Sequence, residues 1–576
     1  MQEKRWTFIP KSKLPTHELA ERLNIEKSLV ELLHQRGVTN FEEAEAFFRP
    51  QLGHIHDPFL MKDMDKAVKR VLKAFEKEEK ILVYGDYDVD GTTAVSLMYT
   101  FLTKHYPNVE FYIPDRYTEG YGVSYQGIDY ASKNNFKLII ALDCGIKAIE
   151  KVDYAKEKGV DFIICDHHRP GDEIPKATAV LDPKRKDCNY PYDELCGCGV
   201  GFKLVQALNQ ELGFKFEELE EYFDLLVVSI ASDIVPVTGE NRVLAYFGLK
   251  KINHSPRKGI AEILKLSALK RELNITDVVF IIGPRINAAG RMKSGMNAVR
   301  LLVSGEDDTA KELGVFIESE NKQRKNFDKS ITQEALKMIE ENETYLAAKS
   351  TILFDKNWHK GVIGIVASRV IETYYKPTII LTESNGKAAG SARSVQGFDV
   401  YNAIDECSDL LDQFGGHKYA AGLTMPIENI DAFRKKFDEV VSNSILDEQL
   451  VPEIKIDSEI NLNQLTPEPG QQFPKFYRII KQFAPFGPLN MHPVFMAKAV
   501  QAKYIKVVGE THLKLTIYQE SNQHQTFDCI GFGLADYFEN LQNNSYFDIA
   551  FVIEENTWNG NTKLQLNIRD IKPQQP

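Results

Sequence analysis

Acidic residues follow apolar runs at three places in the first half of this 576-residue sequence, and two histidines come directly after the last of them. Together these residues are Asp86, Asp88, Asp90, Asp143, Asp166, His167 and His168. Carboxylates and imidazoles without thiolates favour Mg²⁺ or Mn²⁺ over structural zinc. Two such ions about 3.5–4 Å apart can hold the attacking and leaving oxygens of a phosphoryl group, and a water that they activate replaces a Ser or Cys nucleophile. The pattern therefore predicts a metal-dependent phosphoesterase centre.

Other interpretations of these acids are weaker. A lone Asp at the end of a strand usually caps a helix or closes a turn. The spacing of Asp86, Asp88 and Asp90 is similar to a calcium loop, but no Glu follows at the required offset. Asp233 follows the apolar run at 225–231 and would be a helix cap if it stood alone. Beside the other three motifs, we predict that Asp233 is a further metal ligand.

A parallel sheet would bring these residues together. The expected strands are 81–84, 109–113, 138–142 and 162–165, and the expected crossover helices are 92–104 and 148–158. Such alternation predicts βαβ units in an α/β fold. Because the carboxyl ends of parallel strands face one crevice, five carboxylates and two imidazoles are expected to converge there.

The rest of the chain divides by composition and periodicity. Residues 1–63 are expected to form short helices, 64–305 the catalytic domain, 306–348 a long connecting helix, 349–445 a second α/β domain and 446–576 a β-rich domain. The expected strands of the last domain are 499–508, 512–518, 526–531, 547–554 and 563–571. Five short strands favour a small barrel of the oligonucleotide-binding (OB) type, and a β-sandwich fits the pattern nearly as well.

Composition excludes several classes of protein. The hydrophobic fraction of 43% is typical of a globular protein, and no apolar run approaches the ~20 residues of a membrane-spanning helix. Seven cysteines without a regular spacing, and no apparent signal peptide, suit a cytoplasmic protein. The net charge of −12 alone argues against nucleic-acid binding. Acids concentrated in a metal site would nevertheless leave basic residues free to line a separate groove.

The motifs resemble, in order and content, those of the DHH phosphoesterase superfamily. Within it, the chain resembles the RecJ branch of single-strand-specific 5′→3′ exodeoxyribonucleases. The segments that carry this resemblance are 85–91, Asp143, 166–168, Asp233, 283–292, 358–369, 390–394 and 414–417. The resemblance extends over nearly the whole chain and is weakest in the last hundred residues. It implies a DHH domain, a connecting helix and a substrate-binding DHHA1 domain.

The resemblance also implies roles for individual residues. The expected ligands of two Mn²⁺ or Mg²⁺ ions are Asp86, Asp88, Asp90, Asp143, His167 and Asp233. Asp166 is expected to orient a histidine, and His168 to touch the scissile phosphate. Tyr84 stands where some members of the superfamily carry a metal-binding His, which leaves the ligands of the first metal open.

Phosphate-binding residues are expected in both central domains. They are Arg116, Arg285, Arg291, Ser391, Arg393, Gly415, Gly416 and His417. Ser391 and Arg393 are expected to flank a glycine-rich turn, where Arg can bind a phosphate in bidentate fashion. The alternatives are a solvated loop for Arg116, a surface salt bridge for Arg393 and a structural role for Arg285 or Arg291.

Two further groups of residues have competing interpretations. Tyr504, Tyr518 and Phe527 are available to stack on bases in the last domain, although each is also a candidate core residue. Cys188, Cys196 and Cys198 lack the usual spacing of a zinc site and are expected to be packing residues.

The function expected from the resemblance is Mn²⁺- or Mg²⁺-dependent degradation of single-stranded DNA from its 5′ end, in recombination and repair. The expected partners of this monomer are single-stranded DNA, a single-strand-binding protein and a helicase, with no membrane contact. One alternative is a DHH phosphodiesterase acting on short oligonucleotides or cyclic dinucleotides. A non-catalytic relative is a third possibility, which the intact set of acids and histidines disfavours.

Overall fold

The computed structural model describes residues 3–292, 294–543 and 546–574. The chain forms two compact units, which we call the N-half unit and the C-half unit. The N-half unit comprises Glu45–Arg324 and Phe483–Met491. The C-half unit comprises Met1–Ala44, Lys325–Gln482 and His492–Pro576.

The N-half unit is built on a five-stranded parallel sheet with the strand order β3-β2-β4-β5-β6. Its strands are β2 (Lys80–Gly85), β3 (Val109–Tyr112), β4 (Phe136–Leu142), β5 (Asp161–Cys165) and β6 (Ala179–Leu181). The four strands expected from the sequence are confirmed. Strand β6 was not predicted, because a three-residue apolar run gives too short a pattern.

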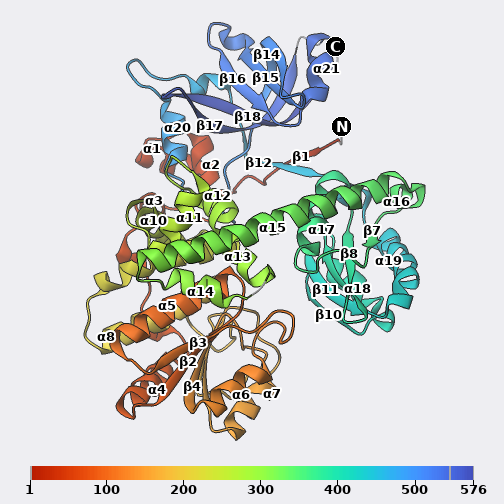
Figure 1. The fold of residues 1–576 in the computed structure, drawn as a ribbon. Helices are drawn as coiled ribbons and strands as arrows, with labels where there is room; N and C mark the ends of the chain where they lie inside the picture. Colours follow the sequence, from red (N-terminus) through yellow and green to blue (C-terminus); the bar gives the residue numbers. More distant parts are fainter. Residues whose placement is uncertain (1–2, 293, 544–545, 575–576) are drawn as a thin grey trace. The chain divides into compact units, whose positions relative to one another are not determined.

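Helices cover both faces of this sheet (Figure 1). They are α4 (Met64–Glu76), α5 (Val89–His105) and α8 (Gly197–Glu211) on one face, and α6 (Tyr125–Lys133) and α7 (Ile149–Glu157) on the other. Successive side chains of a strand point to opposite faces, so Val83 packs in the first layer and Leu82 in the second. Burial on both faces explains why these strands are continuously apolar.

A group of helices completes the N-half unit. They are α9 (Phe223–Ser232), α10 (Gly239–His254), α11 (Lys258–Ser267), α12 (Ile275–Asp277), the π turn η4 (Val278–Ile282), α13 (Gly283–Met292) and α14 (Met296–Leu302). The expected long helix is α15 (Asp307–Glu340), whose residues belong to both units. It ends eight residues earlier than predicted, because the side chain of Asn342 caps a separate helix, α16 (Glu343–Ala347).

A mixed five-stranded sheet in the C-half unit has the order β10-β11-β9-β8-β7. Its strands are β7 (Thr351–Phe354), β8 (Thr378–Ser384), β9 (Lys387–Arg393), β10 (Gln413–His417) and β11 (Ala420–Met425). Only β7 and β8 pair in parallel. Helices α17 (Ile363–Thr373), α18 (Val400–Asp405) and α19 (Ile430–Ser444) supply apolar side chains to its two cores.

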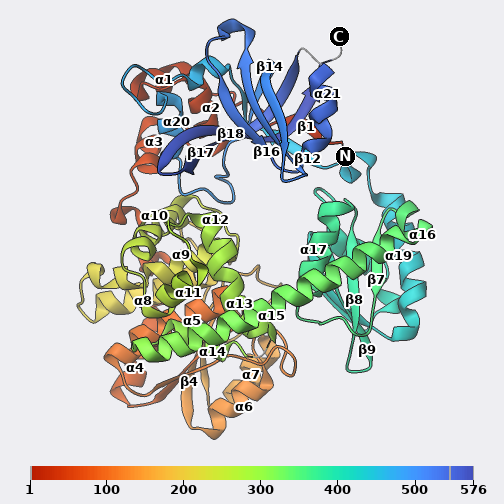
Figure 2. The same cartoon turned by 45° about the horizontal axis from the view of Figure 1, so that its top comes forward.

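The last strands close into a barrel (Figure 2). They are β14 (Phe495–Val508), β15 (His512–Gln519), β16 (Phe527–Gly531), β17 (Phe547–Trp558) and β18 (Asn561–Pro573), with helix α21 (Phe538–Asn543) before β17. Their order is β14-β15-β16-β18-β17, and β17 pairs again with β14. This closure confirms the predicted barrel and excludes the β-sandwich.

The N-terminal residues form one strand and short helices. Strand β1 (Arg5–Phe8) pairs in parallel with β12 (Glu453–Ile456), and the N-terminal helices are α1 (Thr16–Leu23), α2 (Lys27–Gln35) and α3 (Phe41–Phe48). Strand β13 (Ser458–Glu459) pairs with β14. Helix α20 (Lys475–Lys481) precedes the barrel in the sequence. Within the described ranges, no helix combines the length and the apolar character that crossing a bilayer requires.

Candidate metal centre

Three neighbouring strands deliver acids to one edge of the N-half sheet. Asp86 follows β2, Asp143 follows β4 and Asp166 follows β5, and β4 lies between β2 and β5. Asp143 has φ of 59°, a left-handed conformation that is rare for residues other than Gly, Asn and Asp. Such strained conformations occur preferentially at functional sites.

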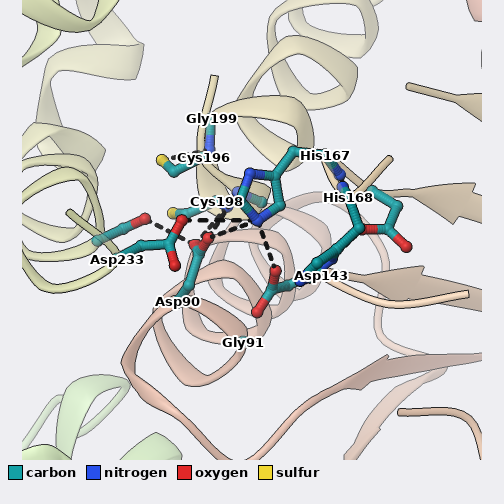
Figure 3. A network of polar contacts seen from close by, with 12 residues as sticks. Asp90, Gly91, Asp143, His167, His168, Cys196, Cys198, Gly199 and Asp233 are labelled. Carbon is teal, nitrogen blue, oxygen red and sulfur yellow. Dashed lines mark hydrogen bonds and ion pairs between the residues drawn. The ribbon is translucent and has the colours of Figure 1, made fainter. Parts of the chain in front are cut away.

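The imidazole of His167 lies at the centre of the acidic cluster (Figure 3). Its Nε2 lies 3.3 Å from Asp143 Oδ1, 3.5 Å from Asp233 Oδ2 and 3.7 Å from Asp90 Oδ2. These residues come from the end of β4, the end of α9 and the first turn of α5. Four separate elements therefore place potential ligand atoms around one point.

Several of these atoms lack the hydrogen bonds that buried polar atoms normally make. Among the described residues, His167 Nδ1 and Nε2, Asp143 Oδ1 and Asp86 Oδ2 are buried without a hydrogen-bond partner. A buried polar atom without a partner costs free energy of about 1–3 kcal/mol. A divalent cation coordinated by these atoms would remove that cost, so the donor set fits Mn²⁺ or Mg²⁺.

The beginning of α8 holds Asp90. Its Oδ2 accepts a hydrogen bond from the Gly197 amide at 2.6 Å, and its Oδ1 accepts from the Cys198 amide at 2.7 Å and from Ser229 Oγ at 2.6 Å. A Cβ on Gly197 would lie 2.6 Å from Asp143 Oδ1, so only glycine fits there. Cys196 and Cys198 belong to the hydrophobic core.

The remaining two acids of the first motif lie beside this group. Asp86 is buried, and its Oδ1 accepts a hydrogen bond from the Tyr87 amide at 2.7 Å. Asp88 is the N-cap of α5, and its Oδ1 accepts from the Gly91 amide at 2.9 Å. Asp88 therefore caps the helix and also lies beside the acidic cluster.

Electrostatic repulsion within the cluster is strong. Burial raises the pKa of four carboxyl groups above its ordinary value, and the negative charges of their neighbours raise it further; they are Asp86, Asp88, Asp143 and Asp233. Burial also lowers the pKa of His167, which favours the neutral imidazole that can bind a metal. The folded chain thus gathers negative charge where a cation would neutralise it.

Asp166 orients His168. It accepts hydrogen bonds from the amides of Ile146, His167 and His168, and its Oδ1 lies 2.7 Å from Nδ1 of His168. Burial alone would raise the pKa of Asp166, but the hydrogen bond and charge of His168 lower it to about 2. Burial opposes protonation of His168, but Asp166 raises the pKa of His168 to about 9.

Two of the three predicted arginines of the N-half unit lie near this cluster. The guanidinium of Arg116 lies 5.0 Å from the centre of the Tyr87 ring, and its charge opposes the rise in the pKa of Asp86. The charge of Arg291 also acts on Tyr87. Arg285 is different, because its Nε donates to Glu318 at 2.6 Å and its Nη1 to the Ile281 carbonyl at 2.7 Å. Arg285 therefore forms a largely buried ion pair with Glu318, which favours the structural role that the sequence analysis gave as the alternative.

Tyr84 does not contribute to the cluster. Its ring belongs to the core on the α6 and α7 face of the sheet. Its hydroxyl donates to the Gly122 carbonyl at 2.9 Å and accepts from the Ser124 amide at 3.1 Å. Both directions of this hydroxyl are occupied, so Tyr84 does not replace a metal-binding histidine.

In the C-half unit, the predicted phosphate-binding residues lie on strands and not beside a turn, because this segment pairs on both sides within the sheet. Ser391 and Arg393 belong to β9, and Arg393 Nη1 donates to Ser391 Oγ at 3.0 Å. A Cβ on Gly364, in the first turn of α17, would lie 2.9 Å from both side chains. An Arg, a Ser and a helix N-terminus thus lie together, as in many anion-binding sites.

The motif Gly415, Gly416 and His417 forms most of the exposed edge strand β10. Through β11, His417 lies in the same row of the sheet as Arg393, and Gly415 in the row of Ser391. Gly416 has φ of 149°, and a Cβ there would lie 2.3 Å from the Ala420 carbonyl. The sheet therefore aligns the two C-half motifs.

Asp182 is a further candidate metal ligand, which was not predicted from the sequence. It follows β6, as the other acids follow β2, β4 and β5, and its buried Oδ2 has no partner among the described residues. Burial raises the pKa of Asp182 to about 7. The apolar run 179–181 followed by an acid is the same pattern as in the other motifs, but the run is too short to predict a strand. Ser229, which binds Asp90, gave no sequence signal of its own.

Comparisons with known proteins show the family of this chain. Three family models match the chain: the DHH family, N-terminal domain, at residues 80–230; the DHHA1 domain at 342–443; and the RecJ OB domain at 456–570. The single-stranded-DNA-specific exonuclease RecJ of Bacillus subtilis is 36% identical, over 98% of this chain and 70% of the relative. The chain belongs to the RecJ family.

Other RecJ proteins support this assignment over the full length. The RecJ of Salmonella typhimurium is 30% identical, over 94% of this chain and 95% of its own length. The crystal structure of RecJ from Thermus thermophilus in complex with Mn²⁺ has a TM-score of 0.83 at 26% identity, covering 99% of this chain and 80% of that chain. The Mg²⁺ complex of the same protein has a TM-score of 0.77 at 25% identity, covering 99% and 79%.

Proposed function

We propose that this RecJ-family protein is a Mn²⁺- or Mg²⁺-dependent exonuclease that degrades single-stranded DNA from its 5′ end with two metal ions. The observation that carries the proposal is the convergence of Asp90, Asp143 and Asp233 on Nε2 of His167. The names of the relatives support the substrate, and the Mn²⁺ and Mg²⁺ complexes of the Thermus protein support the metals. The 5′→3′ direction rests on the family resemblance.

Two overlapping groups of side chains support the proposal of two ions. One group contains Asp143 and His167, beside His168, and the other contains Asp90, His167 and Asp233. His168 itself, which Asp166 holds protonated, is assigned to the substrate and not to a metal. We assign the ligands as Asp86, Asp88, Asp90, Asp143, His167 and Asp233. Bound ions would polarise the scissile phosphodiester and activate water for attack.

The chain's own residues would bind and orient the substrate. His168, held protonated by Asp166, presents a hydrogen-bond donor next to the cluster. Arg116 and Arg291 supply positive charge near the same cluster, and Ser391, Arg393 and His417 form a second candidate phosphate site.

The barrel is the candidate surface for single-stranded DNA. Tyr504 is 53% exposed and is available for stacking, whereas Phe527 is buried in the barrel. A monomeric state, a cytoplasmic location, and a single-strand-binding protein and a helicase as partners stay predictions.

The test uses a long single strand labelled at its 5′ or 3′ end, incubated with the full chain and Mn²⁺, Mg²⁺ or EDTA. We expect immediate release of the 5′ label as a short product, progressive shortening of the 3′-labelled strand, and no reaction in EDTA. Release of the 3′ label first would contradict the direction. Cleavage of dinucleotides with an intact long strand would instead favour a phosphodiesterase of short oligonucleotides.

A further inference from the structure

The loop between β3 and α6, residues 114–124, carries side chains that lie beside the metal centre. Arg116 packs over the ring of Tyr87, and the hydroxyl of Tyr121 lies 3.4 Å from Nε2 of His168. The rings of Tyr121 and Tyr87 also meet edge to face, with centroids 6.0 Å apart. This loop, which we call the β3–α6 loop, therefore contacts both the acidic motif and the histidine motif.

Glu119 ties the loop together from within. Its carboxylate accepts hydrogen bonds from the Tyr112 hydroxyl at 3.0 Å, from Ser124 Oγ at 2.6 Å and from the Asp115 amide at 2.9 Å. These donors come from the end of β3, from the N-cap of α6 and from the beginning of the loop. One side chain thus fixes both ends of the loop.

Tyr84, on strand β2, also holds the β3–α6 loop. The hydroxyl of this buried residue of β2 binds the backbone of Gly122 and Ser124, as described above. Its ring stacks on Tyr112, with centroids 5.5 Å apart and an interplanar angle of 17°. A Cβ on Gly127 would lie 2.6 Å from the Tyr84 ring, so glycine in the first turn of α6 allows this packing.

The hydrogen bonds of this network distinguish it from the metal centre. Both oxygens of Glu119 accept hydrogen bonds, and the Tyr84 hydroxyl both donates and accepts. Asp143 Oδ1 and the nitrogens of His167, in contrast, have no hydrogen-bond partner in the described part of the chain. Polar groups whose hydrogen bonds are all made indicate a rigid support, whereas buried polar groups without hydrogen-bond partners indicate a ligand site.

We propose that Glu119 and Tyr84 are positioning residues, which hold the β3–α6 loop so that Arg116 and Tyr121 are presented to the substrate strand. The proposal rests on the proposed function. Neither residue touches the reacting atoms, and both act through the loop. The polar network then reduces the conformational entropy that the loop would lose when it binds DNA.

The first experiment measures steady-state degradation of 5′-phosphorylated single-stranded DNA with Mn²⁺. Tyr84→Phe removes one hydroxyl and keeps the ring. We expect KM to rise about 3- to 10-fold, the effect of losing one or two net hydrogen bonds, with kcat within about 2-fold of the unsubstituted protein. Glu119→Ala should raise KM at least as much. Glu119→Gln should raise KM less than Glu119→Ala, because the side-chain carbonyl oxygen of Gln can still accept a hydrogen bond from the Asp115 amide. A control is Tyr154→Phe, which removes the hydrogen bond to Asp129 on the same face of the sheet and should leave KM unchanged.

A double-mutant cycle tests whether the two residues act through the loop. In an Arg116→Ala, Tyr121→Ala background, we expect Glu119→Gln and Tyr84→Phe to raise KM much less than they do alone, because both groups that they position are gone. Full additivity would overturn the proposal. A fall in kcat with unchanged KM, or weaker Mn²⁺ binding by calorimetry, would also overturn it, since either result assigns these residues to the metal centre.

Hydrogen exchange gives a readout that needs no substrate. We expect Tyr84→Phe and Glu119→Ala to speed exchange in peptides that cover 114–124, and to leave those covering β4 and β5 unchanged. If the unsubstituted protein degraded no DNA, the proposed function would fail while this measurement still tested the loop support. Unchanged exchange in 114–124 would overturn the support itself, whatever the activity.

Discussion

At the scale of single residues, His167 shows what the chemistry of the cluster requires. One ring nitrogen faces three carboxylates, and a single proton could satisfy only one of them. Burial favours the neutral ring, so without a cation the cluster is both repulsive and short of hydrogen bonds. The side chains around His167 that would bind a metal ion thus lower the stability of the metal-free fold.

Asp143→Asn tests that conflict. Removing one negative charge should stabilise the metal-free protein by about 0.5–2 kcal/mol, whereas activity with Mn²⁺ should fall by about 100-fold or more. Chemical denaturation in EDTA and a nuclease assay measure the two effects. Asp153→Asn, at an exposed position of α7, is the control and should change neither. A destabilised metal-free variant with normal activity would contradict the assignment.

The Asp166–His168 pair makes metal-free stability depend on pH. The pKa of His168 rises from 6.5 to about 9 on folding, so its contribution is complete below pH 6.5 and is lost as the pH rises through 9. The raised pKa of Asp143 acts in the same direction, because the folded carboxyl binds its proton more tightly. In EDTA, we expect Tm to fall from pH 7 to pH 9, and His168→Asn to flatten this decline. A constant or rising Tm would be evidence against the pair.

The acids at the ends of β2, β4 and β5 were predictable, because a strand followed by Asp is a local pattern. The hydrogen bonds from Gly197, Cys198 and Ser229 to Asp90 were not, because the donors lie more than one hundred residues away in sequence. The role of Tyr84 was also hidden, because its hydroxyl partners are backbone atoms of a loop.

At the scale of elements, the pair Arg285 and Glu318 joins α13 to α15. Both side chains are largely buried, at 9% and 14% exposure. The sequence motif around Arg285 suggested phosphate binding, because it contains arginines among small residues. Small residues also allow helices to pack closely, and only the packing of α13 distinguishes the two roles.

Arg285→Ala separates these roles. Because removal of one partner leaves Glu318 as a buried unpaired charge, we expect a loss of about 3 kcal/mol in the free energy of unfolding. The KM for single-stranded DNA should stay unchanged under conditions where the variant is folded. Arg300→Ala, at an exposed position of α14, is the matched control. A raised KM with normal stability would restore the phosphate-binding interpretation.

Element prediction was most reliable for long, buried patterns. Strands β2 to β5 and the barrel strands gave clear apolar runs, and the structure confirms them. Strand β9 consists largely of Gly, Ala and Ser, and β10 contains two consecutive glycines. Gly and Ser are typical of turns and Ala is depleted in strands, so the place of both segments in a sheet was not apparent. Pairing with β11 overrides their low strand propensity.

At the scale of the whole molecule, the net charge of −12 gives little information about DNA binding. Negative charge is concentrated at the metal centre, while Lys506 and Lys514 face each other across β14 and β15. Like charges opposed across two strands cost free energy. Such a pair, beside the exposed Tyr504, favours a surface that binds phosphates and bases.

The Lys506→Ala, Lys514→Ala double variant should weaken binding to a long single strand. The slope of log Kd against log salt concentration should fall by about 1–2. Cleavage of a dinucleotide should be unaffected, because the metal centre is unchanged. Fluorescence anisotropy at several salt concentrations measures the slope, and Lys475→Ala on α20 is the control. An unchanged slope would remove these lysines from the DNA-binding surface.

The proposed ligands are spread along the chain from Asp86 to Asp233 and reach one point only in the folded N-half unit. An ion held by them would link distant segments as a disulfide does, but the link could exchange with the surrounding solution. The supply of Mn²⁺ or Mg²⁺ would then set not only the turnover of each molecule but also its lifetime against proteolysis. Removal of both ions would then cost the protein its resistance to proteolysis as well as its activity.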